Sequence, residues 1–300
     1  MHAYLNGRFI PAAEAAVSVT DGGFVQGTAV AEQLRTFGGK LFRLEAHIDR
    51  LLRSLAIVEV DPGTSREEFI RVARELVERN HPLLATGDDL GLSIFVTPGQ
   101  YVPMRGKGVI RPTVGLHTFP LRFELWADHY KLGQSLVTSD VAQVSADCWP
   151  RELKCRSRMH YYLADLHARR RDPGSRALML DEEGFVTETT TANIVLSTRE
   201  GLVTPPREKI LPGISMAVLL ELAESMGIHH TQRDLTPPDV TAAYEVFITS
   251  TSSCILPIVR LNAQPVGDGA PGPMYTRLLA AWTDLVGVDI ASQAGRFAAR

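Results

Sequence analysis

The feature that most constrains the fold of this chain is a helix-like run followed by two extended runs. One lysine comes directly before the helix-like run, and one glutamate lies within the second extended run. Lys154 comes directly before residues 155–171, whose pattern predicts a helix. The β-forming runs 177–180 and 187–196 follow and are predicted to pair as a hairpin, and Glu188 lies in the second of them. Helix and strand therefore alternate in the centre of the chain, which indicates a mixed fold.

Lys154 and Glu188 are the two residues on which a chemical hypothesis can be built. Leu153 precedes the lysine and an aromatic-rich helix follows it, so partial burial is expected. A buried lysine has a lowered pKa and becomes a usable amine nucleophile. A Schiff-base lysine and a carboxylate paired with a pyridinium nitrogen are the groups that a pyridoxal phosphate site needs most. The alternatives are a solvated surface lysine and, from strand alternation, a glutamate on the solvent face.

The composition is typical of a soluble globular protein with two domains. The chain has 300 residues, of which 45% are hydrophobic and 22% charged, and its formal net charge is −3. This balance gives no general attraction to nucleic acid or anionic lipid. Three cysteines without Cys-x-x-Cys spacing predict neither a disulfide framework nor a metal site, so a cytoplasmic location fits best. The N-terminus has no signal pattern, and no apolar run reaches spanning length.

The order of the predicted elements divides the chain into two domains. We expect a first domain at 1–118, a connection at 119–132, where aromatic residues, charges and a proline mix, and a second domain at 133–300. The predicted fold class is α+β or mixed α/β. The main predicted helices are 45–57, 65–79, 155–171, 211–226 and 273–286, and the main predicted strands are 3–10 (as a hairpin), 90–97, 109–118, 135–138 and 246–250.

Three further groups are candidates for binding a phosphate. A Leu-Pro-Gly sequence leads into a helix at residues 214–215, whose exposed N–H groups favour an anion, although many helices begin this way as a plain cap. Residues 249–253 follow a strand as a cluster of hydroxyl and amide groups, or form a Ser/Thr-rich turn. Arg50 could hold a phosphate through its guanidinium fork, or pair with Glu45 or Asp49 on its own helix.

Taken in order, these groups resemble the fold type IV pyridoxal phosphate enzymes, which include branched-chain and D-amino acid aminotransferases and 4-amino-4-deoxychorismate lyase. The resemblance covers residues 3 to 285, and the order and spacing of its blocks argue against a chance match. The blocks are His47-Ile-Asp-Arg50-Leu, Lys154 before the central helix, Leu180-Asp-Glu-Glu-Gly-Phe-Val-Thr-Glu188 with Asn193-Ile, Thr204-Pro-Pro with Ile210-Leu-Pro-Gly-Ile-Ser215, Glu245-Val-Phe-Ile-Thr-Ser-Thr251 with Ile255-Leu-Pro, and Gly269-Ala-Pro-Gly-Pro273.

The resemblance implies a small N-terminal α/β domain and a larger C-terminal domain with pyridoxal 5′-phosphate between them, in a homodimer. It implies that Lys154 is the Schiff-base lysine and shuttles a proton between the substrate Cα and C4′ of the cofactor. It also implies that Glu188 pairs with the pyridine nitrogen. The residues implied to hold the phosphate are Arg50, Ile214 and Ser215 through their amides, Ser250 and Thr251.

Several positions depart from the family's substrate pocket. In the D-amino acid branch an arginine follows the Val-Thr strand where Pro98 stands here, and Gln100 takes the place of a histidine. Ala31 replaces an aromatic residue, so one pocket wall is smaller, and the tyrosine of branched-chain enzymes shortly after the lysine is absent. Arg156 or Arg158 could supply a replacement carboxylate contact, or lie exposed on the predicted helix. The residues expected to face the substrate are Ala31, Pro98, Arg158 and Ser252.

The expected function is an aminotransferase that moves an amino group between an amino acid or amine and a 2-oxo acid, with a branched-chain-like or atypical substrate. The alternative is a lyase that releases pyruvate from an aminochorismate, because an arginine four residues after the lysine, as Arg158 is, also occurs in lyases. The third hypothesis is a non-catalytic binding protein, which has no need of both Lys154 and Glu188. Cys155, beside the lysine, is expected to be packed and not reactive.

Overall fold

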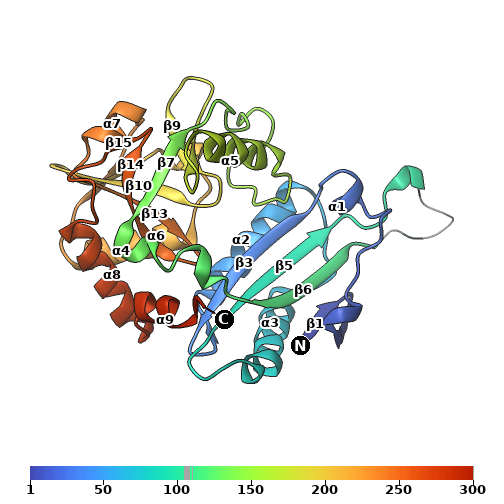
Figure 1. Cartoon of the computed structure of the whole chain (residues 1–300). Coiled ribbons are helices and arrows are strands. Elements are labelled where there is room, and N and C mark those ends of the chain that lie inside the picture. Colours follow the sequence, from blue (N-terminus) through green and yellow to red (C-terminus); the bar gives the residue numbers. More distant parts are fainter. Residues whose placement is uncertain (105–108, 110, 300) are drawn as a thin grey trace. The chain divides into compact units, whose positions relative to one another are not determined.

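The computed structural model describes residues 1–104, 109 and 111–299, and the chain forms two compact units (Figure 1). Unit 1 consists of Met1–Leu121 and Leu153–Ser157, and unit 2 consists of Arg122–Glu152 and Arg158–Arg300. The domain limits inferred from the sequence stay a prediction. They differ from the two units in two respects. They assign Leu153–Ser157 to the C-terminal part, whereas this segment packs with unit 1, and they treat 119–132 as a connection, whereas the first unit boundary lies between Leu121 and Arg122.

Unit 1 is a six-stranded antiparallel sheet in the order β2-β1-β6-β5-β3-β4, with two helices against one of its faces. The strands are β1 (His2–Leu5), β2 (Arg8–Pro11), β3 (Val30–Phe37), β4 (Lys40–Leu41), β5 (Leu90–Thr97) and β6 (Thr113–Pro120). The helices are α1 (Gly22–Val25), α2 (Leu44–Ile57) and α3 (Arg66–Asn80). Residue 110 of the predicted strand 109–118 lies outside the described residues.

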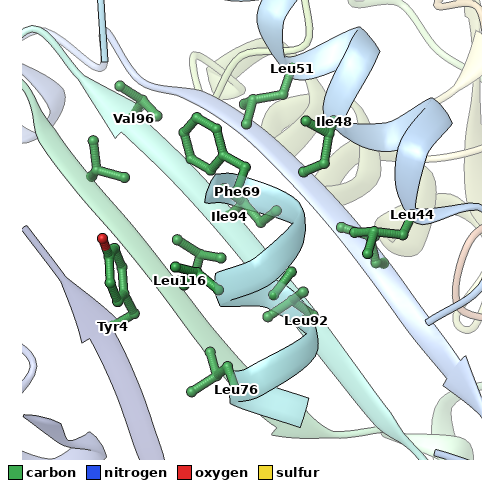
Figure 2. Packing of buried hydrophobic residues seen from close by; sticks show 14 of the residues in the cluster. Tyr4, Leu44, Ile48, Leu51, Phe69, Leu76, Leu92, Ile94, Val96 and Leu116 are labelled. Atoms are coloured by element: carbon green, nitrogen blue, oxygen red, sulfur yellow. The ribbon is translucent and has the colours of Figure 1, made fainter. Parts of the chain in front are cut away.

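The core of unit 1 follows from the period of two residues in its strands and the period of about 3.6 residues in its helices. Every second residue of β5 is apolar and buried on the helix side, and the i, i+3, i+4 pattern of α2 supplies a matching stripe. Figure 2 shows these side chains packed between the sheet and both helices. The core residues labelled there are Tyr4, Leu44, Ile48, Leu51, Phe69, Leu76, Leu92, Ile94, Val96 and Leu116.

Unit 2 is built on a nine-stranded mixed sheet in the order β12-β11-β10-β13-β14-β7-β8-β9, with β15 paired to β14. β9 pairs with β8 and, through Glu188 and Asn193, also with β10, so the strands from β10 to β9 in this order close into a ring. The strands are β7 (Gln134–Thr138), β8 (Arg176–Leu180), β9 (Val186–Thr189), β10 (Asn193–Thr198), β11 (Gly201–Thr204), β12 (His230–Gln232), β13 (Glu245–Ser250), β14 (Cys254–Leu261) and β15 (Gln264–Pro265). The helices are α4 (His129–Leu132), α5 (Met159–Arg171), α6 (Ile214–Ser225), α7 (Pro237–Ala242), α8 (Pro273–Val286) and α9 (Ile290–Phe297).

Four predicted elements differ from the structure by three residues or more. The predicted helix 211–226 begins at Ile214, and the predicted strand 109–118 begins at Thr113. The helix predicted from residue 155 begins at Met159, because the backbone from Lys154 to Arg156 is extended and pairs with residues at the start of β3. The predicted strand 187–196 is two strands, β9 and β10, because the chain turns between them and the Thr189 amide donates to the Ala192 carbonyl at 2.8 Å. No helix in the described part of the chain is long and apolar enough to cross a membrane.

Candidate active site

Lys154 lies in unit 1, in the short extended segment that pairs with the start of β3. Its carbonyl accepts a hydrogen bond from the Ala31 amide at 3.0 Å, and the Arg156 amide donates to the Ala29 carbonyl at 2.7 Å. The Lys154 amide donates to Ser54 Oγ of α2 at 3.2 Å. These bonds hold the lysine backbone between β3 and α2. The residue itself is half-buried, as expected from the sequence.

Arg50 is buried on α2 and pairs with Glu32 of β3. Nε and Nη2 of Arg50 donate to the two carboxylate oxygens of Glu32 at 2.6 and 2.8 Å, and His47 Nδ1 lies 2.8 Å from Glu32 Oε2. Burial raises the pKa of Glu32, but the charge and hydrogen bonds of Arg50 and His47 outweigh burial and hold that pKa well below its ordinary value. Burial lowers the pKa of His47, so a neutral imidazole donates Nδ1–H to the carboxylate near pH 7.

The carboxylates considered from the sequence as partners of Arg50 have other partners. Glu45 pairs with Arg74 at 2.7 Å, and Asp49 pairs with Arg66 at 2.6 Å, both on the exposed side of α2. Glu45 and Asp49 are neighbours of Arg50 in the sequence of α2. The side chain of Arg50, however, points to the buried side of the helix, where it pairs with Glu32 of β3. Sequence neighbours on a helix therefore do not decide this ion pair.

Glu188 lies in unit 2, and its carboxylate is buried with only 6% of the residue exposed. Gln143 Nε2 and Tyr161 OH donate to its Oε1 at 2.8 and 2.9 Å, and Asn193 Nδ2 donates to its Oε2 at 3.4 Å. The solvent-face alternative for Glu188 is therefore wrong. Alternation fails as a guide here because all four residues of β9 are buried, which is the pattern of a strand covered on both faces.

Tyr161 of α5 is the second titratable group of this network. Burial raises the pKa of its phenol, and the adjacent charge of Glu188 raises it further. The phenol is therefore protonated near neutral pH and donates to the carboxylate. Gln143 Nε2 also donates to the phenol oxygen at 3.1 Å, so the three side chains form one network.

The amide side chain of Asn193 connects the loop before α6 with Glu188. Asn193 Nδ2, which donates to Glu188, also donates to the Leu211 carbonyl at 2.9 Å. A Cβ on Gly213 would overlap Asn193 Oδ1, so a side chain at this position would displace the loop. In the described structure no side chain caps the N-terminus of α6, which begins with Ile214 and the buried Ser215. Its first N–H groups are therefore available to an anion.

The turn between β13 and β14 lies beside this helix end through strand pairing. Thr249 pairs with Asn193 across β13 and β10, and its Oγ1 is buried without a hydrogen-bond partner among the described residues. Ser250 Oγ lies 2.9 Å from Ser253 Oγ, and Tyr130 OH donates to the Ser253 carbonyl at 2.8 Å. A buried unsatisfied hydroxyl next to an uncapped helix end fits a phosphate group. The residues of unit 2 thus fit an anionic group.

The residues expected to face the substrate are divided between the two units. Ala31 is buried in β3 and Pro98 is half-buried after β5, whereas Arg158 is the N-cap of α5 and Ser252 lies half-buried in the β13–β14 turn. Arg156 is exposed but lies before the helix, so its predicted place on a helix face is wrong. Nη2 of Arg156 donates to Ser93 Oγ of β5 at 2.8 Å.

Sequence reasoning missed the pairing of Glu32 with Arg50 and His47, and it missed Gln143 and Tyr161 as partners of Glu188. A signal existed for Glu32, because Val30 and Leu34 share its side of β3 and predict burial for the acid between them. His47 likewise falls on the apolar stripe of α2. Gln143 lies outside every regular element, and nothing in its sequence neighbourhood singles it out.

Comparisons with known proteins identify the family of this chain. The family model for class IV amino-transferases matches residues 29–261. The chain is 31% identical to the D-alanine aminotransferase of Bacillus licheniformis, over 91% of this chain and 93% of that protein. It is 30% identical to a putative branched-chain-amino-acid aminotransferase of Methanocaldococcus jannaschii, over 95% of this chain and 96% of that protein.

Solved structures agree with the family model. The branched-chain amino acid aminotransferase of Escherichia coli aligns with a TM-score of 0.86 at 25% identity, over 95% of this chain and 94% of its own. The T.th. enzyme of the same name, solved with pyridoxamine 5′-phosphate, aligns with a TM-score of 0.85 at 24% identity, over 98% of this chain and 96% of its own. At that identity the second alignment shows the fold alone.

The chain therefore belongs to the class IV aminotransferase family, and it is a transaminase with the mixed α and β fold of that family. The resemblance inferred from the motifs is confirmed. The relatives named above are aminotransferases, so the lyase alternative is not favoured.

Proposed function

We propose that this transaminase uses pyridoxal 5′-phosphate and moves an amino group between an amino acid and a 2-oxo acid, with Lys154 and Glu188 serving the same cofactor. When bound, the cofactor supplies an electron sink for negative charge at the substrate α-carbon. The observation that supports the proposal best is the buried Glu188 carboxylate, held by three side-chain donors close to an uncapped helix end. A buried carboxylate is costly unless it meets a positive partner, and a protonated ring nitrogen is such a partner.

Glu188 would keep a proton on the ring nitrogen through charge and hydrogen bonding. Tyr161 and Gln143 both donate to Oε1 and so orient the carboxylate. Lys154 would hold the cofactor through its side-chain amine, take the proton from the substrate Cα and return it at C4′ of the cofactor. The bonds that Lys154 makes to β3 and α2 restrict its backbone, so the amine works from a fixed base.

The phosphate would be bound by backbone amides and hydroxyl groups together with one guanidinium group. The amides of Ile214 and Ser215 lie at the start of α6, and Ser250 and Thr251 lie at the end of β13. Arg50 would add its charge, and Glu32 would orient its guanidinium group through the bidentate contact. The unsatisfied hydroxyl of Thr249 supports an anion at this place.

The substrate pocket departs from that of the D-amino acid branch. Pro98 and Gln100 stand where the D-amino acid branch has an arginine and a histidine, and Ala31 stands where the family has an aromatic side chain. We therefore propose a branched-chain-like or atypical amino donor, bound without the carboxylate clamp of the D-amino acid branch. A homodimer is proposed from the family resemblance alone.

The test is a visible absorption spectrum of the purified protein after reconstitution with pyridoxal 5′-phosphate. We expect a protein-bound band that a suitable amino donor bleaches, and we expect Lys154→Ala to lose it. Lys131→Ala, which removes an exposed lysine of α4, should keep the band. A colourless wild-type protein, or a Lys154→Ala variant with unchanged spectrum and turnover, would overturn the proposal. Pyruvate release without a 2-oxo acid acceptor would instead identify a lyase.

A further inference from the structure

The face of the unit 1 sheet opposite the helices has an ordered composition. The registers of β3, β5 and β6 place Ala31, Phe95 and Gly115 in one cross-strand row. The next row on the same face consists of Gln33, Ser93 and His117. The apolar core residues lie on the other face, so this second face is free of the helices that cover the core.

The side chains of Lys154 and Arg156 leave their segment on this second face. Cys155 is bridged to Val30, whose side chain belongs to the core, and Leu153 packs against the same core. Because successive side chains of an extended segment point to opposite sides, Lys154 and Arg156 point away from that core. The bond from Arg156 Nη2 to Ser93 Oγ at 2.8 Å agrees with this direction.

Arg156 is the source of positive charge in the row centred on Ser93. Gln33 and Ser93 are uncharged. His117 is exposed, but partial desolvation and the charge of Arg156 lower the pKa of its imidazole, which is therefore neutral near pH 7. Arg35 lies one row further on this face, but its guanidinium group stacks over Phe37 at 4.0 Å and its Nε donates to the Thr36 carbonyl at 3.2 Å. Arg35 is therefore built into the sheet, whereas Arg156 is exposed to solvent.

We propose that Arg156, oriented by Ser93, binds the carboxylate of the amino acid whose amino group reacts at Lys154. The inference rests on the proposed function and names a residue that decides its substrate class. Lys154 and Arg156 are two residues apart on an extended segment, so their Cα atoms are separated by roughly 6.6 Å and their long side chains can reach the two ends of one small amino acid. A guanidinium group matches a carboxylate through two parallel N–H bonds.

Two positions named from the sequence are weaker candidates for this role. Pro98 has no charge to offer a carboxylate. Arg158 begins α5 in unit 2 and belongs, through its effect on the pKa of Tyr161, to the surroundings of the Glu188 network. Arg156 combines two properties that neither of them has together. It is charged, and it shares a sheet face with Lys154 within unit 1.

The experiment compares substrates with and without a carboxylate, using Arg156→Met in the reconstituted holoenzyme. We expect KM for the best amino acid donor to rise roughly 10- to 100-fold, since a hydrogen-bonded charge is lost, and KM for the corresponding amine without a carboxylate to stay unchanged. Calorimetric titration with butanoate, which involves no turnover, should show the same loss of affinity. Arg170→Met removes an exposed arginine near the end of α5 and is the matched control, expected to behave as wild type.

A second variant separates the effect of the position of the Arg156 guanidinium group from the effect of its charge. Ser93→Ala keeps the Arg156 charge but removes its anchor, so we expect a rise in KM for the amino acid of roughly 3- to 10-fold. Unchanged KM and unchanged butanoate affinity in Arg156→Met, with the cofactor band intact, would overturn the assignment of Arg156 and leave the transaminase proposal standing. Loss of the cofactor band in the wild-type protein would instead refute the proposed function itself.

Discussion

The phenol of Tyr161 donates to Oε1 of Glu188 across 2.9 Å, and Gln143 donates to the same oxygen at 2.8 Å. Two donors on one carboxylate oxygen restrict the rotation of the Glu188 side chain. Because the pKa of Tyr161 is raised by burial and by the charge of Glu188, the phenol remains a donor near neutral pH. Tyr161 is thus a positioning residue for the carboxylate that would keep the cofactor ring protonated.

Tyr161→Phe removes one donor from Glu188 without removing the ring that packs in α5. We expect kcat to fall about 3- to 10-fold with KM unchanged, because one net hydrogen bond is lost. The visible absorption of the bound cofactor should also titrate at lower pH, since a less well oriented carboxylate holds the ring proton less firmly. A pH titration of the absorption spectrum checks this.

Tyr162→Phe is the matched control for this prediction, because Tyr162 is the next residue of α5 and is 61% exposed. Its spectrum and kcat should equal those of the wild type. If Tyr161→Phe lowers kcat but leaves the spectral titration where it was, Tyr161 supports only the fold and not the charge of Glu188.

Glu32→Gln removes the charge that balances the buried guanidinium group of Arg50. We expect a loss of about 3 to 5 kcal/mol in the free energy of unfolding, which is typical when one partner of a buried ion pair is removed. Urea unfolding at pH 7 measures it. Glu45→Gln on α2 breaks an exposed pair with Arg74 and should cost less than about 1 kcal/mol. Equal effects of the two variants would show that burial adds nothing to the Glu32 pair.

The same pair predicts a pH dependence with a definite sign. The pKa of Glu32 is lower in the folded than in the unfolded chain, so its contribution to stability is full above the ordinary glutamate pKa and is lost as the pH falls toward the folded value. The difference in unfolding free energy between wild type and Glu32→Gln should therefore be largest near neutral pH and shrink below about pH 4. A difference that grows on acidification would contradict this assignment.

Gly213→Ala tests the loop that leads into α6. Gly213 has φ −68°, a value that alanine adopts freely, so any effect comes from the overlap of its Cβ with Asn193 Oδ1. We expect a loss of about 1 to 3 kcal/mol in stability and weaker retention of pyridoxal phosphate, because the displaced loop moves the amides of the helix start. Denaturant unfolding and cofactor release on dialysis measure the two effects.

Gly295→Ala provides the control for Gly213→Ala. Gly295 lies within α9, and a Cβ there meets nothing within 4 Å. Since alanine has the higher helix propensity, this variant should equal the wild type or gain up to about 1 kcal/mol. A neutral Gly213→Ala would mean that Asn193 adapts without moving the loop.

Several features of this protein follow from local sequence. The apolar stripe of α2 and the alternation in β5 predict a sheet covered by helices, because both periods are set by backbone geometry within the segment. The motif blocks around Lys154 and Glu188 indicate the family, since their order and spacing along the chain are visible without a fold. The existence of α6 is also predicted, although from residue 211 and not from Ile214, because its glycine and proline are local signals.

Other features depend on residues that meet only after folding. The sequence predicts a helix from residue 155, yet the chain is extended there, because its partners Ala29 and Ala31 lie more than a hundred positions earlier. Local alternation misses the burial of Glu188 for a similar reason. Its strand is covered on both faces when β9 joins β10 and closes the ring, and no local pattern records that closure.

The sequence by itself indicated the family, favoured an aminotransferase over a lyase, and predicted roles for the lysine, the carboxylate and the start of α6, because these are short segments with a recognisable order and spacing. The tertiary structure decided which groups meet: Glu32 with Arg50, Tyr161 with Glu188, and Arg156 with Ser93. The physical reason is that a hydrogen bond between distant residues is selected by the burial and packing of whole elements, whereas local propensity acts within a few residues of the chain.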